Sequence, residues 1–493
     1  MHDLSEVTLP PSPSSRRFWL GVGFLVLIVL AAVYGLLYFA AGKRLQEALR
    51  ETDQLDPGWR LEEILAQRPP ISDEDNSAVQ TMTVHKLLPP RWPAWEYANS
   101  TPTRPRAAEE ENRLEELKES FRDLGPPDRL SEAQLQALRD ELQRAAPAVA
   151  EARKLATLPR GRHPLVYKKE DLSILLTTVQ VPRQSVHLLH YDALLRAAEG
   201  DVEGALLSAT AALNAGRSLG DEPMFIPQLV RLACRAIAIR SIERALAQGQ
   251  TPGVKLAALQ RVLEEEEAEP LLLIALRGER ADVDGMLEAV QRGEIKMEYL
   301  WPLALEGLSP NVPWETVQLY VPGAVKNSRA AYLRYVNQLV EIARLPVEQQ
   351  AVRIQEVEAL LPKQPLIVRV LGPTMGKVAR ATRRGHADLR CAATALAVEQ
   401  YRLEHGRWPE TLTALGPTYL RAVPVDPFDG APLRFRHDKE GVVVYSVGPD
   451  DQDDGGDFET LNTHKQGTDL GFRLWEVERR QQPPAAPIGK KAP

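Results

Sequence analysis

The sequence predicts a mainly α-helical protein with a membrane helix at its N-terminus and a small α+β module at its C-terminus. Three observations lead to this fold class. There is an uncharged apolar run near the N-terminus, apolar residues recur at helical spacing through most of the chain, and short strands separated by turns follow late in the sequence. At 493 residues the chain is too long for one ordinary core, so we expect two or more domains.

The membrane helix is predicted for residues 18–41, after a polar tail at 1–17. These 24 residues carry no charge, and a helix needs roughly 20 apolar residues to cross a bilayer. A secretory signal has a shorter apolar core of about 7–15 residues. Trp19, Tyr34 and Tyr38 lie towards the ends of the run, where aromatic rings favour the membrane interface. We therefore expect a single span.

The orientation of this span is weakly marked by charge. Arg16 and Arg17 precede it, and Lys43, Arg44 and Arg50 follow it, so the positive-inside comparison is nearly balanced. A short tail followed by a long chain favours the tail inside and the bulk of the protein outside.

Residues 42–170 alternate helical patterns with proline-bearing breaks. A helix after the span should end at the Asp-Pro-Gly turn of residues 56–58, and a second should end at Pro69-Pro70. Ser131 is placed to cap the helix that follows it.

Residues 171–370 read as an α-helical body of helical hairpins. Tyr191 to Pro223 resembles one tetratricopeptide-type hairpin, with a turn at Gly200-Asp201 and small residues where the helices cross. The 34-residue period of such repeats does not recur cleanly, so a regular solenoid is not predicted. The run Glu264 to Glu267 is expected to solvate a helix end.

Residues 371–475 are predicted to form a long helix followed by a small antiparallel sheet. His405-Gly406 is a helix stop, and turn chemistry at Asp426-Pro427 and Asp429-Gly430 separates short strands. Residues 476–493 have a disordered composition.

Composition excludes some classes of function. The net charge of −7 and the pI of about 5.9 do not favour nucleic acid as a partner. Cys234 and Cys391 lie in apolar helical stretches and are expected to pack in the core, not to form a disulfide framework or a thiolate metal site.

Three motifs are weak signals of chemistry. Ser218 lies in a G-x-S-x-G pattern, but a helical run precedes it where a nucleophile elbow needs a strand. His187 and His190 are one helical turn apart, yet zinc needs three or four ligands. Basic residues are enriched between Arg369 and Arg390, which indicates a solvated helix face or, as the alternative, a surface for membrane or partner binding.

The acidic loop that follows the Val442–Ser446 run is the strongest candidate site. Five aspartates and two glycines crowd into eight residues: Asp450, Asp451, Asp453, Asp454, Gly455, Gly456 and Asp457. Catalysis would need two carboxylates in different environments, whereas these are expected to be wet and ionised. Calcium wants six to eight oxygen ligands on a chain that curls around it. The position-twelve glutamate of an EF-hand is replaced by Leu461, so the residues alone leave a calcium cage and a solvated turn as alternatives.

Three ordered motifs carry a resemblance to a known family. A helix ends in "YRLEHGRWP", a "PVDPFDG" turn follows, and "VVVYS" leads into the acidic glycine-containing loop. Over about 85–100 residues this order resembles the C-terminal part of the major pseudopilin of type II secretion systems. The resemblance implies that calcium binds in the loop, with ligand roles for Asp450, Asp453, Asp454, Asp457 and Asp469. More than 300 residues separate the span from this module, so processing and assembly as a pilus subunit are not expected.

The expected protein is therefore a single-pass protein of the bacterial inner membrane, with most of the chain on the periplasmic side. The expected function is a scaffold or assembly role with protein partners and a calcium-binding C-terminal module. The alternatives are an envelope hydrolase with an unrecognised active site, or an accessory component of a type II secretion-like apparatus.

Overall fold

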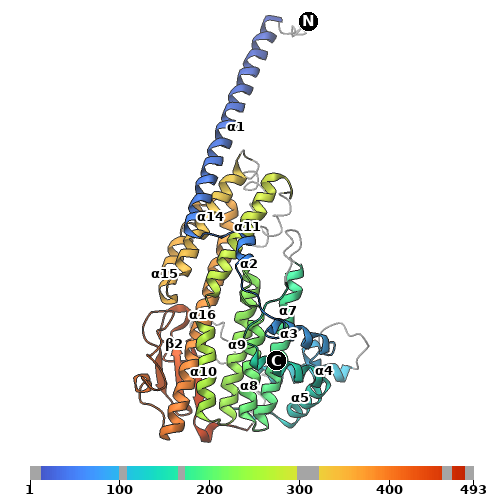
Figure 1. Cartoon of the computed structure of the whole chain (residues 1–493), viewed down its shortest axis with the longest axis vertical. Coiled ribbons are helices and arrows are strands. Elements are labelled where there is room, and N and C mark those ends of the chain that lie inside the picture. Colours follow the sequence, from blue (N-terminus) through green and yellow to red (C-terminus); the bar gives the residue numbers. More distant parts are fainter. Residues whose placement is uncertain are drawn as a thin grey trace, which may run out of the picture. The chain divides into compact units, whose positions relative to one another are not determined.

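The computed structural model describes residues 13–98, 108–164, 173–296, 321, 323–457 and 469–483 (Figure 1). It confirms a mainly helical chain with an N-terminal apolar helix and a small sheet. The predicted polar tail, residues 1–17, is described only from residue 13, where α1 begins. The predicted disordered tail, residues 476–493, is described only as far as residue 483, and there Arg480 is buried and donates to Glu399 at 2.9 Å. The helices are α1 (Pro13–Leu55), α2 (Leu61–Ala66), α3 (Ser77–Leu87), α4 (Ala108–Arg122), α5 (Glu132–Arg144), α6 (Ala146–Arg153), α7 (Ser173–Ala198), α8 (Val202–Arg217), α9 (Phe225–Gln248), α10 (Gly253–Glu267), α11 (Leu271–Arg292), α14 (Ala324–Ala343), α15 (Val347–Glu358) and α16 (Leu366–His405).

The chain divides into two compact units, each assembled from separate stretches. Unit 1 comprises residues 1–59, 280–338 and 359–373, and unit 2 comprises residues 60–279, 339–358 and 374–493. The helices α11, α14 and α16 have residues in both units.

Unit 1 is built on the second half of α1. Its buried face consists of Ala41, Leu45, Ala48 and Thr52, and their three- and four-residue spacing puts them on one side of a helix. Asn337 of α14 donates a hydrogen bond from Nδ2 to the Thr52 hydroxyl, at 2.8 Å. The first half of α1 is different, because its apolar side chains are exposed.

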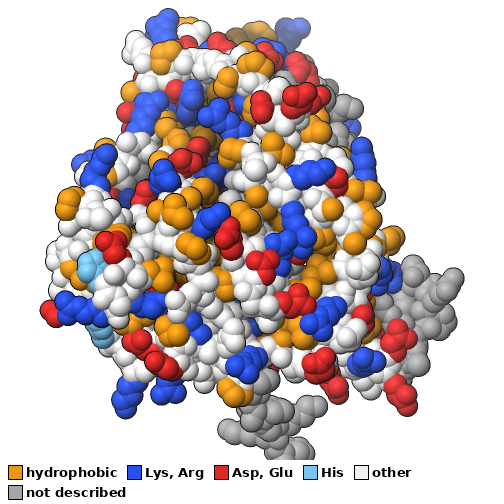
Figure 2. Space-filling view, turned by 60° about the horizontal axis from the view of Figure 1, so that its bottom comes forward, with side chains coloured by type: hydrophobic (Ala, Val, Ile, Leu, Met, Phe, Trp, Pro, Cys, Tyr) orange, Lys and Arg blue, Asp and Glu red, His pale blue; other side chains and the backbone are white. Residues whose placement is uncertain are grey.

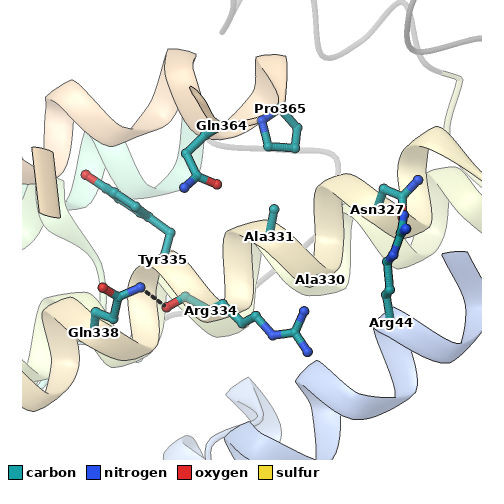
Figure 3. A pocket seen from close by; sticks show the side chains of 9 residues that line it. All are labelled: Arg44, Asn327, Ala330, Ala331, Arg334, Tyr335, Gln338, Gln364 and Pro365. Carbon is teal, nitrogen blue, oxygen red and sulfur yellow. Dashed lines mark hydrogen bonds between the residues drawn. The ribbon is translucent and has the colours of Figure 1, made fainter. Parts of the chain in front are cut away.

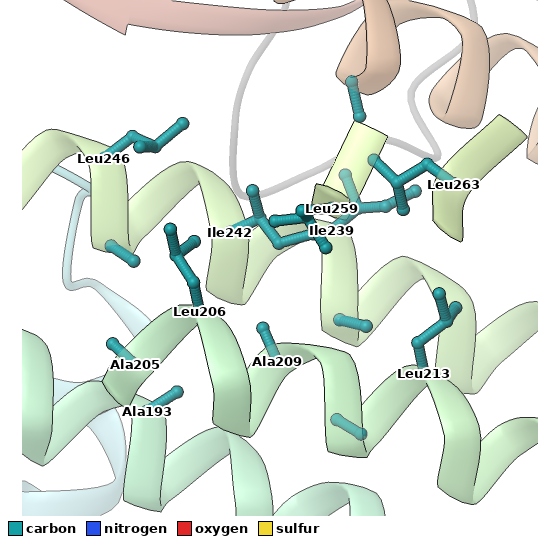
Figure 4. Close-up of a cluster of buried hydrophobic side chains, with 14 of the residues drawn as sticks. Ala193, Ala205, Leu206, Ala209, Leu213, Ile239, Ile242, Leu246, Leu259 and Leu263 are labelled. Carbon is teal, nitrogen blue, oxygen red and sulfur yellow. The ribbon is translucent and has the colours of Figure 1, made fainter. Parts of the chain in front are cut away.

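Unit 2 has a core of close-packed helices. Consecutive helices α7, α8 and α9 pack against one another, and α8 meets its neighbours through alanines that are fully buried, including Ala205, Ala209 and Ala212 (Figure 4). Such small side chains let helix backbones approach closely. The turn between α7 and α8 uses Gly200 at φ +86° and Asp201 as N-cap, as the sequence predicts. The tetratricopeptide assignment itself is not confirmed.

The sheet of unit 2 has three antiparallel strands in the order β1 (Arg434–His437), β2 (Gly441–Ser446) and β3 (Leu470–Trp475). The central strand pairs Val444 with Phe435 on one side and with Phe472 on the other. All six residues of β2 are buried, which suits its β-branched composition. Helix α9 packs against β3, so the sheet is joined to the helical core.

The face shown in Figure 2 carries acidic and basic side chains that are interspersed, with hydrophobic side chains scattered among them. This mixture is typical of a solvated protein surface.

Candidate metal site in the acidic loop

The loop is anchored by Asp426, which lies in the Pro-x-Asp-Pro turn before β1. Its fully buried carboxylate accepts hydrogen bonds from the Ser446 hydroxyl at 2.8 Å and from the Val447 N–H at 2.9 Å. The Phe428 N–H donates to it as well, at 2.9 Å. Asp426 therefore ties the turn to the end of β2, where the acidic loop begins.

Arg434 on β1 forms ion pairs with three carboxylates. Its guanidinium donates to Asp426 at 3.0 Å, to Asp429 at 2.5 Å and to Asp453 at 3.0 Å. Asp453 also accepts from the Tyr445 hydroxyl at 3.2 Å and from the Gly455 N–H at 2.9 Å. Burial raises the pKa of Asp453, but these hydrogen bonds and the charge of Arg434 outweigh it and hold the pKa below its ordinary value. The positive charge next to Asp453 is therefore supplied by the Arg434 side chain.

Asp469 closes the loop from its far end. Its carboxylate is buried and accepts from the Gly456 N–H at 2.6 Å and from the Asp454 N–H at 3.3 Å. Its own N–H donates to the carbonyl of Asp457 at 3.2 Å. Burial raises the pKa of Asp469, and the charges of Asp453 and Asp454 raise it further, although the backbone hydrogen bonds oppose the shift. A positive charge near Asp469 would relieve this destabilisation of its ionised form.

The first two aspartates of the loop have different partners. Asp450 accepts a hydrogen bond from the Gln452 N–H at 3.3 Å. Asp451 has φ +58° and accepts from Arg383 of α16 at 3.2 Å. Arg383 also donates to the carbonyl oxygens of Pro427 and Phe428, so it joins the long helix to the turn.

The residues fit a metal only in part. The structure brings Asp453, Asp454, Asp457 and Asp469 into one loop. A nearby cation would stabilise the ionised form of Asp469, whose pKa is raised. However, within the described ranges, which omit residues 458–468, no three side chains of ligating type are arranged to hold a metal ion. Asp453 would also have to leave Arg434 to become a ligand.

Sequence reasoning missed Arg434 and Arg383 as the basic side chains that pair with aspartates of the loop. They lie 19 and 68 residues from the aspartates that they contact. Arg434 faces the loop because alternate residues of β1 point to the same side of the sheet. Arg383 lies in the basic segment between Arg369 and Arg390, but nothing in the spacing of that segment links it to the loop.

The other predicted motifs are placed in the helical core. Ser218 is fully buried at the end of α8, where its hydroxyl donates to the Ala215 carbonyl at 2.7 Å and lies 3.4 Å from Nε2 of His163. Burial lowers the pKa of His163 to about 4. A substrate could reach this pair only if the core opened.

The histidines and cysteines are likewise part of the packing. Nδ1 of His190 lies 2.9 Å from the Ser241 hydroxyl, and burial lowers the pKa of His190 to about 3. Cys234 and Cys391 are buried free thiols, and burial raises the pKa of Cys234 to about 12. In the basic segment of α16, Arg390 pairs with Glu267 at 2.8 Å.

Comparisons with known proteins found no matching family model, no matching curated protein and no matching solved structure. The function of the chain is therefore inferred from its fold and from the contacts of its residues.

Proposed function

We propose that the chain is a membrane-anchored scaffold or assembly protein whose single span is the first part of α1. One observation carries the membrane-anchor part of this proposal. The apolar run and the buried face of unit 1 belong to the same uninterrupted helix, Pro13–Leu55. This helix is long and apolar enough to cross a membrane or to act as a signal sequence. Its continuation into the packed residues Leu45, Ala48 and Thr52 favours an anchor that remains attached.

The exposure of the run supports a lipid environment. Phe18 is 66% exposed, Leu20 is 73% exposed and Phe39 is 63% exposed. Contiguous apolar surface of this extent is rare in contact with water, and a bilayer would cover it. Trp19 and Tyr38 lie near its two ends, at the depth where aromatic side chains favour the interface.

Membrane fractionation tests the anchor. After alkaline carbonate extraction, the chain should remain in the membrane pellet, and its intact mass should include residues 1–41. A chain that is found in the supernatant and begins after residue 41 would identify the run as a cleaved signal and overturn the proposal.

The periplasmic side is proposed for both units, in line with the orientation expected from the sequence. The native cysteines are buried, so a Val254→Cys variant places one accessible thiol at a residue that is 71% exposed. In intact spheroplasts it should react with a membrane-impermeant maleimide, whereas a Ser5→Cys variant should react only after lysis. The reverse pattern would place the units in the cytoplasm.

For the acidic loop we propose calcium as the ligand, supported by the resemblance to the pseudopilin module and by the buried carboxylate of Asp469. Calcium at about a hundred times its Kd would stabilise the folded chain by about 2.7 kcal/mol. We expect it to raise the Tm of the detergent-solubilised full chain, and Asp454→Ala to abolish the rise. Asp451→Asn is the matched control, because Asp451 is outside the proposed ligand set. An unchanged Tm in the unaltered chain would refute the site.

The accessory role in a secretion-like apparatus rests on the same resemblance and would make a pilus-type assembly the partner. The hydrolase alternative gains nothing from Ser218, whose hydroxyl is buried and held by a backbone carbonyl.

A further inference from the structure

A cavity of about 390 Å³ lies within unit 1, beside the end of the apolar run (Figure 3). Its floor is formed by Ala330 and Ala331 of α14, and Arg44 of α1 lies at one side. The other lining residues are polar or aromatic, apart from one proline: Asn327, Arg334, Tyr335, Gln338, Gln364 and Pro365. A cavity lined by two arginines and three amides favours a polar, anionic ligand.

The position of the cavity along α1 can be compared with the bilayer. Arg44 is three residues beyond Ala41, the end of the apolar run, which is about 4.5 Å along a helix. The headgroup layer is roughly 5–8 Å thick on each side of the hydrocarbon core. If α1 spans the membrane, the Arg44 side of the cavity lies at the depth of the lipid phosphates.

Helix α14 starts at the same depth. Gly323 directly precedes Ala324, the first residue of α14, and a Cβ at Gly323 would contact Tyr38 and Ala41 of α1. The Lys326 ammonium lies 3.5 Å from the centre of the Tyr38 ring. An amphipathic tyrosine with a lysine above it is typical of a side-chain pair at a membrane interface.

The charge in and around the cavity is not fully neutralised by protein groups. Arg44 donates to the Asn327 side chain at 3.3 Å, and within the described part of the chain it has no carboxylate partner. Arg334 is held in place by Glu51, which accepts from Nε at 2.8 Å and from Nη2 at 2.9 Å, and a Glu47 carboxylate oxygen lies 3.7 Å from Nη2. Its Nη1 donates no hydrogen bond to any residue that the structure describes. Lys326 adds a further positive charge next to Asn327.

We propose that this cavity binds the phosphate of an anionic glycerophospholipid from the adjacent leaflet. Arg44 and Nη1 of Arg334 would donate hydrogen bonds to the phosphate. The amide side chains of Gln338 and Gln364 would donate hydrogen bonds to the hydroxyl groups of the headgroup and accept hydrogen bonds from them. The lipid tails would lie along the exposed apolar surface of α1. This surface distinguishes a lipid from a soluble anion, which has nothing to place there.

The proposed lipid site rests on the proposed membrane span of α1. The experiment is therefore chosen so that failure of the lipid site can be told apart from failure of the span. The full chain is purified in a mild detergent and reconstituted into nanodiscs of phosphatidylcholine that contain a minor fraction of phosphatidylglycerol. Native mass spectrometry then measures phosphatidylglycerol retained per protein. Arg44→Gln should reduce the retained lipid about tenfold, because one charge-assisted contact is lost. Arg50→Gln is the matched control, since Arg50 is an exposed arginine of the same helix that does not line the cavity.

Each possible result of these measurements leads to one conclusion. Equal retention of phosphatidylglycerol by the unaltered chain, Arg44→Gln and Arg50→Gln would overturn the lipid site while the anchor stands. Displacement of the lipid by millimolar glycerol 3-phosphate would show that the cavity takes a soluble phosphate ester, which also overturns it. Extraction of the chain by carbonate would instead refute the anchor. Gln364→Ala, on the far side of the cavity from α1, should weaken retention as well.

Discussion

Glu266 in unit 2 is bound by three arginines in the protein interior. Its carboxylate accepts from Arg217 at 2.6 Å, from Arg231 at 2.7 Å and from Arg235 at 2.7 Å. Burial would raise the pKa of Glu266, but the three guanidinium charges lower it well below its ordinary value. Glu266 is fully buried, so the expectation that the run Glu264 to Glu267 only solvates a helix end is wrong.

Glu266→Gln should destabilise unit 2 by about 3–5 kcal/mol, because it leaves buried guanidinium groups without their carboxylate. Chemical denaturation of the purified chain would measure the change. Glu265→Gln, at the exposed neighbouring position, should change stability by less than about 0.5 kcal/mol. Similar effects of the two substitutions would show that the buried network does not carry this energy.

Glu222 makes stability depend on pH. Burial raises its pKa to about 7, against the charges of Arg68 and Arg162, while its ordinary value is 4.5. The folded state therefore binds the proton more tightly than the unfolded state. The resulting stability is present in full below pH 4.5 and is lost as the pH rises through about 7.

Glu222→Gln should remove this pH dependence. The variant should match the unaltered chain near pH 4 and be more stable by about 1–3 kcal/mol at pH 8. Parallel curves of unfolding free energy against pH for the two proteins would contradict the raised pKa.

The residues of the acidic loop show what local sequence can and cannot predict. Clustered aspartates and glycines were enough to locate the loop. Its charge balance depends on Arg434 and Arg383, which approach only after the sheet and α16 have packed. Pairs of residues that are far apart in the sequence leave no local spacing pattern from which they could be predicted.

Helix boundaries were predicted well where a capping residue or a glycine marks the end of the helix. Ser131 caps α5 by accepting from the Gln134 N–H at 3.2 Å, and Gly406 at φ +70° follows the last residue of α16. The sequence places the start of this helix at residue 371, whereas α16 begins at Leu366 and continues through Pro373. A proline normally indicates a helix break, so here tertiary packing outweighs the local preference.

Two glycines of α11 provide a comparison of packing within one helix. A Cβ at Gly278 would overlap the carbonyl oxygen of Pro223, whereas a Cβ at Gly285 would meet nothing within 4 Å. Gly278→Ala should destabilise the protein by about 1–3 kcal/mol or more through overpacking.

Gly285→Ala should instead stabilise it by up to about 1 kcal/mol, since alanine favours the helix. Thermal unfolding of both variants measures the difference. A Gly278→Ala variant as stable as Gly285→Ala would mean that α11 does not lie against Pro223 in solution.

At the scale of the whole molecule, unit 1 depends on the part of α1 that follows the apolar run. Asp56 pairs with Arg280, and Arg280 donates to the Asn337 side chain at 2.8 Å. The Arg280 guanidinium also lies 5.4 Å from the centre of the buried Trp59 ring. The Asp56–Arg280 pair joins residues that are 224 positions apart, and the Arg280–Asn337 hydrogen bond spans 57. Contacts at such separations are why local patterns did not predict this unit.

Two truncations test this division of α1. A chain that begins at Ala41 lacks the apolar run but keeps the buried face, so we expect it to be soluble without detergent and to resist limited proteolysis in unit 1. A chain that begins at Arg60 also loses Thr52, Asp56 and Trp59, which removes a carboxylate and an aromatic ring from around the fully buried Arg280. Rapid cleavage within residues 280–296 and 323–338 is expected for this second chain alone. Equal resistance of both chains would show that unit 1 folds without α1, and equal sensitivity would show that it needs the apolar run as well.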